Sequence, residues 1–266
     1  MKITELKTVK AVIKLASNMY RLGWDERNGG NISVIIDPEE YKNYLPKKPI
    51  RTFKMNFDAK ELIGRVFVVT GTGKYFKNVE DDPEDTLGIV RIGKDGRSAE
   101  LLWGFKNGGA PTSEFPTHLM SHIARLKKDK DHHVVIHCHA THTLALTYVL
   151  PPDEDEITRT LWRMSTESIV VFPEGIGYLP WMLCGGNEIG EATAKKANDY
   201  RVVLWGAHGV FGMGKNIDET FGLIETVEKS AQIYFLTLGH VKQSITDDQL
   251  KELATAFKVD YKKILK

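Results

Sequence analysis

Val134-Val135-Ile136-His137-Cys138-His139-Ala140-Thr141-His142 places three β-branched residues directly before two histidines that are one residue apart. Successive side chains of a strand lie on opposite faces, so the run predicts a strand on which the first two histidines project together and the cysteine faces away. Imidazoles at this spacing can reach one ion, and neutral imidazole suits zinc. Two ligands do not complete a site, so further donors must come from elsewhere in the chain.

A third histidine follows another expected strand. Residues 202–205 read Val-Val-Leu-Trp and end in Gly206-Ala207-His208-Gly209. Glycine beside a histidine, just past a buried strand, leaves room for a close approach of another group. Taken alone, His208 fits a metal ligand and a turn residue equally well. Beside His137 and His139, it becomes the natural third ligand.

A carboxylate stands at the start of an expected helix that runs to about residue 126. Thr112 or Ser113 can cap this helix, with Glu114 in its first turn. Glu114, His118 and His122 then share one face, where a rival metal site could form. We favour instead a polar stripe against solvent or a neighbouring subunit for the two histidines. For Glu114 we expect a chemical role, because the turn before a helix start holds it in place.

Three short segments can cradle an anion. Two glycines between asparagines expose backbone N–H groups, a glycine turn follows the strand at residues 66–70, and two hydroxyls precede Glu114. An ordinary tight turn remains an alternative for the first, and the second matches neither a nucleotide phosphate loop nor a dinucleotide fingerprint. The segments are Asn28-Gly29-Gly30-Asn31, Gly71-Thr72-Gly73 and Thr112-Ser113.

The length and composition of the chain exclude several classes of protein. The 266 residues suit one domain over residues 1–266, with 42% hydrophobic and 27% charged residues. A formal charge of +1 gives no general case for binding nucleic acid. The 2 cysteines are too few for a disulfide framework, and the chain lacks an 18-residue apolar run and a signal-peptide core. We therefore expect a cytoplasmic protein without a membrane partner.

Hydrophobic periodicity and turn residues place the remaining elements. The segments at residues 37–60 and 173–186 are expected to be loops. Helices are expected at residues 4–22, 112–126, 141–150, 153–162, 187–199, 217–239 and 246–258, and strands at residues 32–36, 66–70, 87–92, 99–103, 134–139, 169–172 and 202–205.

Taken together and in order, these motifs resemble the class II aldolase/adducin superfamily, and its rhamnulose phosphate branch in particular. One departure is that the second anion cradle commonly carries serine where this chain has Thr72, which keeps the hydroxyl. The resemblance covers nearly the whole chain and rests on Gly23-Trp24-Asp25-Glu26-Arg27-Asn28-Gly29-Gly30-Asn31, Thr70-Gly71-Thr72-Gly73-Lys74, Pro111-Thr112-Ser113-Glu114, His137-Cys138-His139-Ala140-Thr141 and His208-Gly209-Val210-Phe211-Gly212.

The resemblance implies a three-layer α/β/α fold with a central mixed, mostly antiparallel sheet. It implies one zinc ion per subunit on His137, His139 and His208, with Glu114 beside it as acid/base or transient ligand. It also implies phosphate bound by the anion-cradle residues, which are Asn28, Gly30, Asn31, Thr72, Gly73, Thr112 and Ser113.

The implied activity is reversible cleavage of L-rhamnulose 1-phosphate to dihydroxyacetone phosphate and L-lactaldehyde through a metal-stabilised enediolate, as in L-rhamnose catabolism. Glu167 is implied to act on the lactaldehyde half from a neighbouring subunit of a C4 homotetramer. A partner for the segment that follows is the alternative role for Glu167. Alternative functions are L-fuculose-phosphate aldolase, pentulose-phosphate 4-epimerase, zinc hydrolase and an adducin-like binding module that lacks catalysis.

Overall fold

A single mixed sheet forms the middle of the molecule in the computed structural model, which describes residues 2–265. Within these residues its nine strands follow the order β2-β5-β4-β3-β1-β6-β9-β8-β7. Every neighbouring pair is antiparallel except β7 with β8. The strands are β1 (Asn31–Ile35), β2 (Arg51–Lys54), β3 (Val66–Thr70), β4 (Leu87–Ile92), β5 (Ser98–Gly104), β6 (Val134–Cys138), β7 (Gly177–Leu179), β8 (Val202–Trp205) and β9 (Gly209–Gly214).

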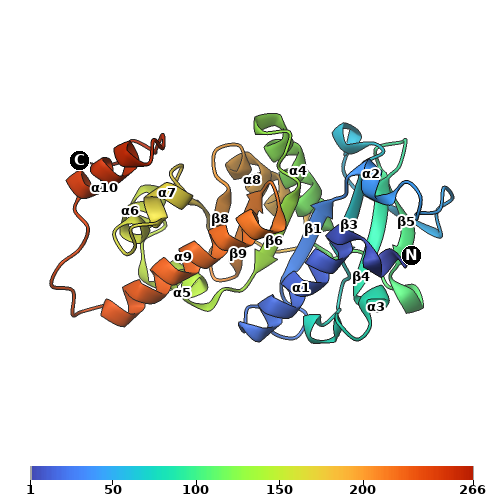
Figure 1. Ribbon diagram of the computed structural model, residues 1–266, viewed down its shortest axis with the longest axis horizontal. Helices are drawn as coiled ribbons and strands as arrows, with labels where there is room; N and C mark the ends of the chain where they lie inside the picture. The colour runs from blue at the N-terminus through green and yellow to red at the C-terminus, as the bar shows by residue number, and fades with distance from the viewer. Residues whose placement is uncertain (1, 266) are drawn as a thin grey trace.

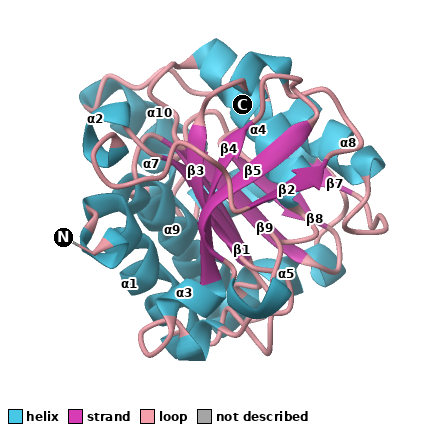
Figure 2. Ribbon diagram, turned by 90° about the vertical axis from the view of Figure 1, so that its right-hand side faces the viewer, coloured by secondary structure: helices cyan, strands magenta, loops and turns pink. Residues whose placement is uncertain are grey.

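Helices cover both faces of this sheet. Helices α1 and α9 lie on the face toward the viewer in Figure 1, and the side view in Figure 2 places α8 on the other side of the strands. The expected three-layer, mostly antiparallel architecture is confirmed. The helices are α1 (Lys7–Arg21), α2 (Pro38–Tyr41), α3 (Pro83–Thr86), α4 (Phe115–Lys128), α5 (Thr141–Val149), α6 (Glu154–Trp162), α7 (Ser168–Val171), α8 (Asn187–Ala197), α9 (Ile217–Thr237) and α10 (Asp247–Ala256). Within residues 2–265, no helix is both long enough and apolar enough to cross a membrane.

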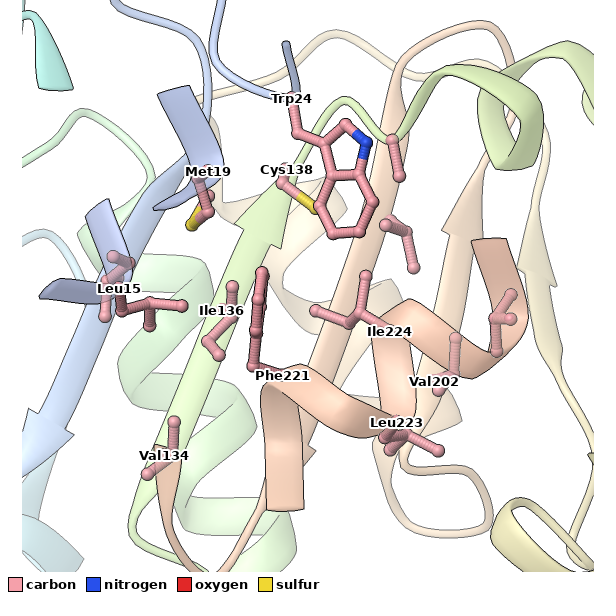
Figure 3. Packing of buried hydrophobic residues seen from close by; sticks show 14 of the residues in the cluster. Leu15, Met19, Trp24, Val134, Ile136, Cys138, Val202, Phe221, Leu223 and Ile224 are labelled. Atoms are coloured by element: carbon pink, nitrogen blue, oxygen red, sulfur yellow. The ribbon is translucent and has the colours of Figure 1, made fainter. Parts of the chain in front are cut away.

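Strand β6 lies at the centre of the sheet, between β1 and β9, and divides its side chains between two cores. Val134, Ile136 and Cys138 belong to the core with α1 and α9, where Figure 3 shows them near Met19, Trp24 and Phe221. Val135 belongs to the opposite core with Trp205 and Phe211, and His137 stacks on Phe211 at a centroid distance of 4.6 Å. Cys138 is fully buried and so belongs to the core, as predicted, and this burial raises the pKa of its thiol to about 12.

The structure corrects three expectations from the sequence. Residues 169–172 were expected to form a strand, but they lie in and just after the helical turn α7. Ser168 at its start shares a hydrogen bond of 2.7 Å with Ser230 of α9, and the Trp162 indole donates to the Phe172 carbonyl. Packing against α9 outweighs the β-propensity of a short β-branched run. The expected loops at 37–60 and 173–186 contain α2, β2 and β7, because the two strands pair at the edges of the sheet.

Candidate metal centre

Three histidines converge where β6 and the β8–β9 turn meet. His137 is the fourth residue of β6, His139 follows that strand, and His208 lies in the turn. One ring nitrogen from each lies within 4.8 Å of the others, and their ring centroids are 4.9 to 5.3 Å apart. The sequence expectation that these side chains project together is therefore met, and Cys138 points to the opposite core.

Hydrogen bonds fix which ring nitrogen of His137 and of His139 faces the cluster. His137 Nδ1 lies 3.1 Å from the Val210 carbonyl oxygen, and His139 Nδ1 lies 2.7 Å from the Glu26 carboxylate. Both partners only accept, so each Nδ1 carries the proton and each Nε2 presents a lone pair. Such outer contacts orient metal-binding imidazoles in proteins.

The His137 Nε2 atom shows that the cluster fits a cation. His137 is 1% exposed, and this nitrogen finds no hydrogen-bond partner among the described residues. An unsatisfied buried acceptor costs roughly 1–3 kcal/mol, which a bound cation would offset. Burial lowers the pKa of His137 well below its usual value and that of His208 to about 4, so both rings stay neutral, as metal ligands must be.

Gly209, directly after His208, leaves space for the close approach of other groups, as expected. A Cβ on Gly209 would lie 2.5 Å from the Cys138 carbonyl oxygen and 2.9 Å from His137 Cε1. A Cβ on Gly29 would lie 2.8 Å from His139 Cε1. Both contacts are too short for a side chain, so these two glycines allow the turns to close around the imidazoles.

Glu114 faces the histidines across the cluster. Its carboxylate is 6% exposed and lies 3.7 Å from His137 Nε2 and 3.9 Å from His208 Nε2. Burial raises its pKa, and the hydrogen bond that Asn31 Nδ2 donates at 2.8 Å acts against that rise. The residue is the N-cap of α4 and not part of its first turn, because the Thr112 hydroxyl accepts from the Glu114 N–H and fixes it before the helix begins.

His118 and His122 contradict the interpretation as a solvent-facing stripe. Both are 0% exposed and lie beneath α4 against β1, where each contacts the Ser33 hydroxyl at 2.8 Å. His118 Nε2 also bonds to Asn31 Oδ1. The shared face of the helix was predicted correctly, but it is the inner face. The polar side chains of β1 bond to both ring nitrogens of His118 and to Nε2 of His122, and these histidines belong to no metal cluster in the described part of the chain.

The second and third anion cradles are joined in space. A bridge pairs Gly71 with Pro111, and the Thr112 N–H donates to the Thr70 carbonyl at 2.9 Å. Thr72 and Ser113 are exposed there, and Gly73 has a φ of +67°. The two loops therefore present hydroxyls and a glycine turn beside the start of α4.

The first cradle borders the histidines. Gly30 has a φ of +72°, and a Cβ on it would lie 3.0 Å from the His137 carbonyl oxygen. Asn28 is exposed, whereas Asn31 is buried with both ends of its carboxamide bonded to Glu114 and His118. A phosphate contact by the Asn31 side chain would therefore have to use its one remaining N–H.

Glu167 lies apart from this cluster within one chain. It is exposed at the start of α7, and its carboxylate accepts a hydrogen bond of 2.5 Å from Ser165, which lowers its pKa. Among residues 2–265, the described contacts do not join it to Glu114 or to the three histidines. Its role in a site formed with a second subunit remains a prediction.

The sequence did not predict three residues that contribute to the site. The Cys184 thiol lies within 4.8 Å of donor atoms of Glu114 and His208, although its loop gave no signal. Glu26 orients His139 from within the motif Gly23-Trp24-Asp25-Glu26-Arg27-Asn28, where the charge could have been noticed. Glu228 of α9 accepts from the backbone N–H groups of His142 and Thr143 at 3.1 and 2.8 Å, and so fixes the start of α5 behind the histidines.

Comparison with known proteins identifies the family of this chain. The family model described as Class II Aldolase and Adducin N-terminal domain matches residues 10–235, so the chain belongs to this family. The resemblance inferred from the motifs is confirmed.

Two curated relatives and one solved structure are similar to this chain over most of its length. A rhamnulose-1-phosphate aldolase of Listeria monocytogenes serotype 4b is 54% identical over 257 residues, which is 96% of this chain and 94% of that protein. One of Enterococcus faecalis is 50% identical over 262 residues, with 97% and 94% covered. The crystal structure of a sugar-phosphate aldolase from Thermotoga maritima aligns with a TM-score of 0.74 at 28% identity, covering 89% of this chain and 97% of that one.

Proposed function

We propose that this chain is a zinc-dependent aldolase that reversibly cleaves L-rhamnulose 1-phosphate to dihydroxyacetone phosphate and L-lactaldehyde. The observation that supports the metal site best is the buried Nε2 atom of His137, which has no hydrogen-bond partner among residues 2–265 and belongs to the cluster that His137 forms with His139 and His208. The substrate is assigned from the rhamnulose-1-phosphate aldolases that are 48–54% identical over nearly the full length.

The three histidines would hold one zinc ion per chain. Bound there, zinc would supply a Lewis acid that stabilises negative charge on the carbonyl and hydroxyl oxygens of the sugar. The hydrogen bonds that hold the Nδ1 atoms of His137 and His139 orient these rings for a cation before substrate arrives. Zinc is favoured among borderline metals by an all-imidazole set that leaves a position open.

Glu114 is the proposed acid/base. In condensation it would take a proton from C3 of dihydroxyacetone phosphate, and in cleavage it would return the proton to the same carbon. Burial raises the pKa of this carboxyl, and a general base works best when its pKa lies near the operating pH. Its fixed place opposite His137 and His208 puts it beside the oxygens that a metal there would hold.

The anion cradles would anchor the phosphate. Backbone N–H groups at Gly30 and Gly73 and the hydroxyls of Thr72, Thr112 and Ser113 lie on loops around the start of α4, a 14-residue helix. A helix N-terminus favours a bound anion, and anchoring the phosphate positions the reacting carbons. Asn28 and Asn31 complete the proposed set.

Glu167 is proposed to act from a neighbouring subunit of a C4 homotetramer, where it would exchange the proton of the hydroxyl on the lactaldehyde half. Its exposure on its own chain supports this, because the side chain is available to a second subunit. We further propose a cytoplasmic enzyme, since Cys138 and Cys184 are unpaired, which fits a reducing compartment.

A substrate panel tests the assignment. Purified protein loaded with zinc is given L-rhamnulose 1-phosphate, L-fuculose 1-phosphate and L-ribulose 5-phosphate. Release of dihydroxyacetone phosphate from the first two is followed by its enzyme-coupled reduction with NADH, and conversion of the third to D-xylulose 5-phosphate is followed by separating the two pentulose phosphates. We expect the first substrate to give the highest kcat/KM. Epimerisation of the pentulose without cleavage of the rhamnulose ester would indicate a 4-epimerase instead. No reaction with any of the three would favour a binding module.

A further inference from the structure

A row of buried polar side chains runs between β1 and α4 and ends at Glu114. Each neighbouring pair is within hydrogen-bond distance, and every member is at most 6% exposed. In order, the row is His122, Ser33, His118, Asn31 and Glu114. The mechanism proposed above uses only the last two, so the two histidines have no function there.

The hydrogen bonds of this row have a defined direction at Asn31. An ionised Glu114 only accepts, so the Asn31 Nδ2 group donates to it at 2.8 Å. The Oδ1 end of the same carboxamide must then accept from His118 Nε2. His118 therefore carries its proton on Nε2 and leaves Nδ1 as an acceptor.

The direction continues to the far end of the row. His118 Nδ1 accepts from the Ser33 hydroxyl at 2.8 Å, and the Ser33 oxygen accepts from His122 Nε2 at 2.8 Å. This leaves His122 Nδ1 without a proton, and that atom finds no partner among residues 2–265. Burial lowers the pKa of His118 to about 3, which fits a neutral ring with a single N–H.

We propose that His118 is a positioning residue which, through Asn31, holds the Glu114 carboxylate in its place for proton transfer. A carboxamide can turn by 180° and exchange its oxygen for its nitrogen. The N–H of His118 prevents this, because a turned amide would point its own N–H at that donor and its oxygen at the Glu114 carboxylate. Two acceptors facing each other inside the protein repel, so Glu114 would move away from His137 and His208. The inference rests on the proposed acid/base role of Glu114.

Two substitutions of His118 separate positioning from simple packing. In His118→Gln, the side-chain N–H₂ can reach the place of Nε2 and donate to Asn31. In His118→Asn, the shorter side chain reaches only the place of Nδ1, beside Ser33, and the donor to Asn31 is lost. Ser121→Ala serves as the matched control, because Ser121 is equally buried on α4 but its hydroxyl has no partner among the described residues.

We expect the loss of the His118 donor to lower kcat and to leave the binding of substrate and zinc unchanged. We expect His118→Asn to lower kcat for L-rhamnulose 1-phosphate about 10- to 100-fold, the usual effect of losing an outer positioning contact. KM and the zinc content should stay at the wild-type values, and His118→Gln should recover most of kcat. Ser121→Ala should match the wild type, with thermal unfolding checking that all variants fold.

Crystal structures of the two variants test the geometry independently of activity. Glu114 is expected to be displaced in His118→Asn and to return in His118→Gln. Equal kcat in the two variants, or an unmoved Glu114 carboxylate in both, would overturn the inference. A wild-type protein that does not cleave the substrate would count against the proposed function, whereas the crystal structures would still decide the role of His118.

Discussion

Replacing His208 with alanine is expected to release zinc and to lower cleavage of L-rhamnulose 1-phosphate roughly a thousandfold. The imidazole is one of the three that form the cluster among residues 2–265, and two histidines alone hold zinc weakly. Lewis-acid stabilisation is worth several kcal/mol, and each ~1.4 kcal/mol changes a rate tenfold. Metal analysis after gel filtration and the NADH-coupled assay measure both effects.

His133→Ala is the control for this variant. His133 lies just before β6, and its ring contacts the Lys130 carbonyl at 3.0 Å instead of the cluster. We expect it to keep both zinc and activity. A His208→Ala protein that retained one zinc ion per chain and its full rate would show that the metal lies elsewhere.

Replacing Glu114 with glutamine should also lower the rate strongly, but for a different reason. Glutamine keeps the shape of the side chain and an oxygen for the Asn31 N–H, but it cannot take up the proton at C3. Loss of general acid–base catalysis lowers rates about 10²- to 10⁴-fold. We therefore expect kcat to fall by this factor while zinc stays bound, because the three histidines are unchanged.

The matched control is Glu61→Gln, since Glu61 is exposed and pairs with Lys127 at 3.0 Å. It should leave kcat and zinc content unaltered. A Glu114→Gln protein with a wild-type rate would contradict the acid/base role. Loss of zinc from this variant would instead make Glu114 a permanent ligand of the metal.

The cluster of three histidines could be predicted from the sequence because its signals are local. The alternation along β6 separates His137 from Cys138, and the glycines beside His208 mark a turn that needs space. Glu114 stands out by its place at a helix start. Each of these features depends on residues within a few positions of one another, so no knowledge of distant packing is needed.

Features that depend on which strand or helix packs against an element could not be predicted from local sequence patterns. Periodicity shows that His118 and His122 share a face of α4, but it does not show that Ser33 and Asn31 on β1 lie beneath that face. The helical turn α7 is likewise set by its packing on α9 and not by its β-branched residues. Strand β2 is short and lies at the edge of the sheet, so its pattern is weak.

Zinc titration of metal-free protein tests the central claim most directly. The protein is stripped with a chelator, and release of dihydroxyacetone phosphate from L-rhamnulose 1-phosphate is measured as zinc is added back. We predict no cleavage without metal and full activity at one zinc ion per chain. Equal cleavage before and after zinc is added would contradict the account.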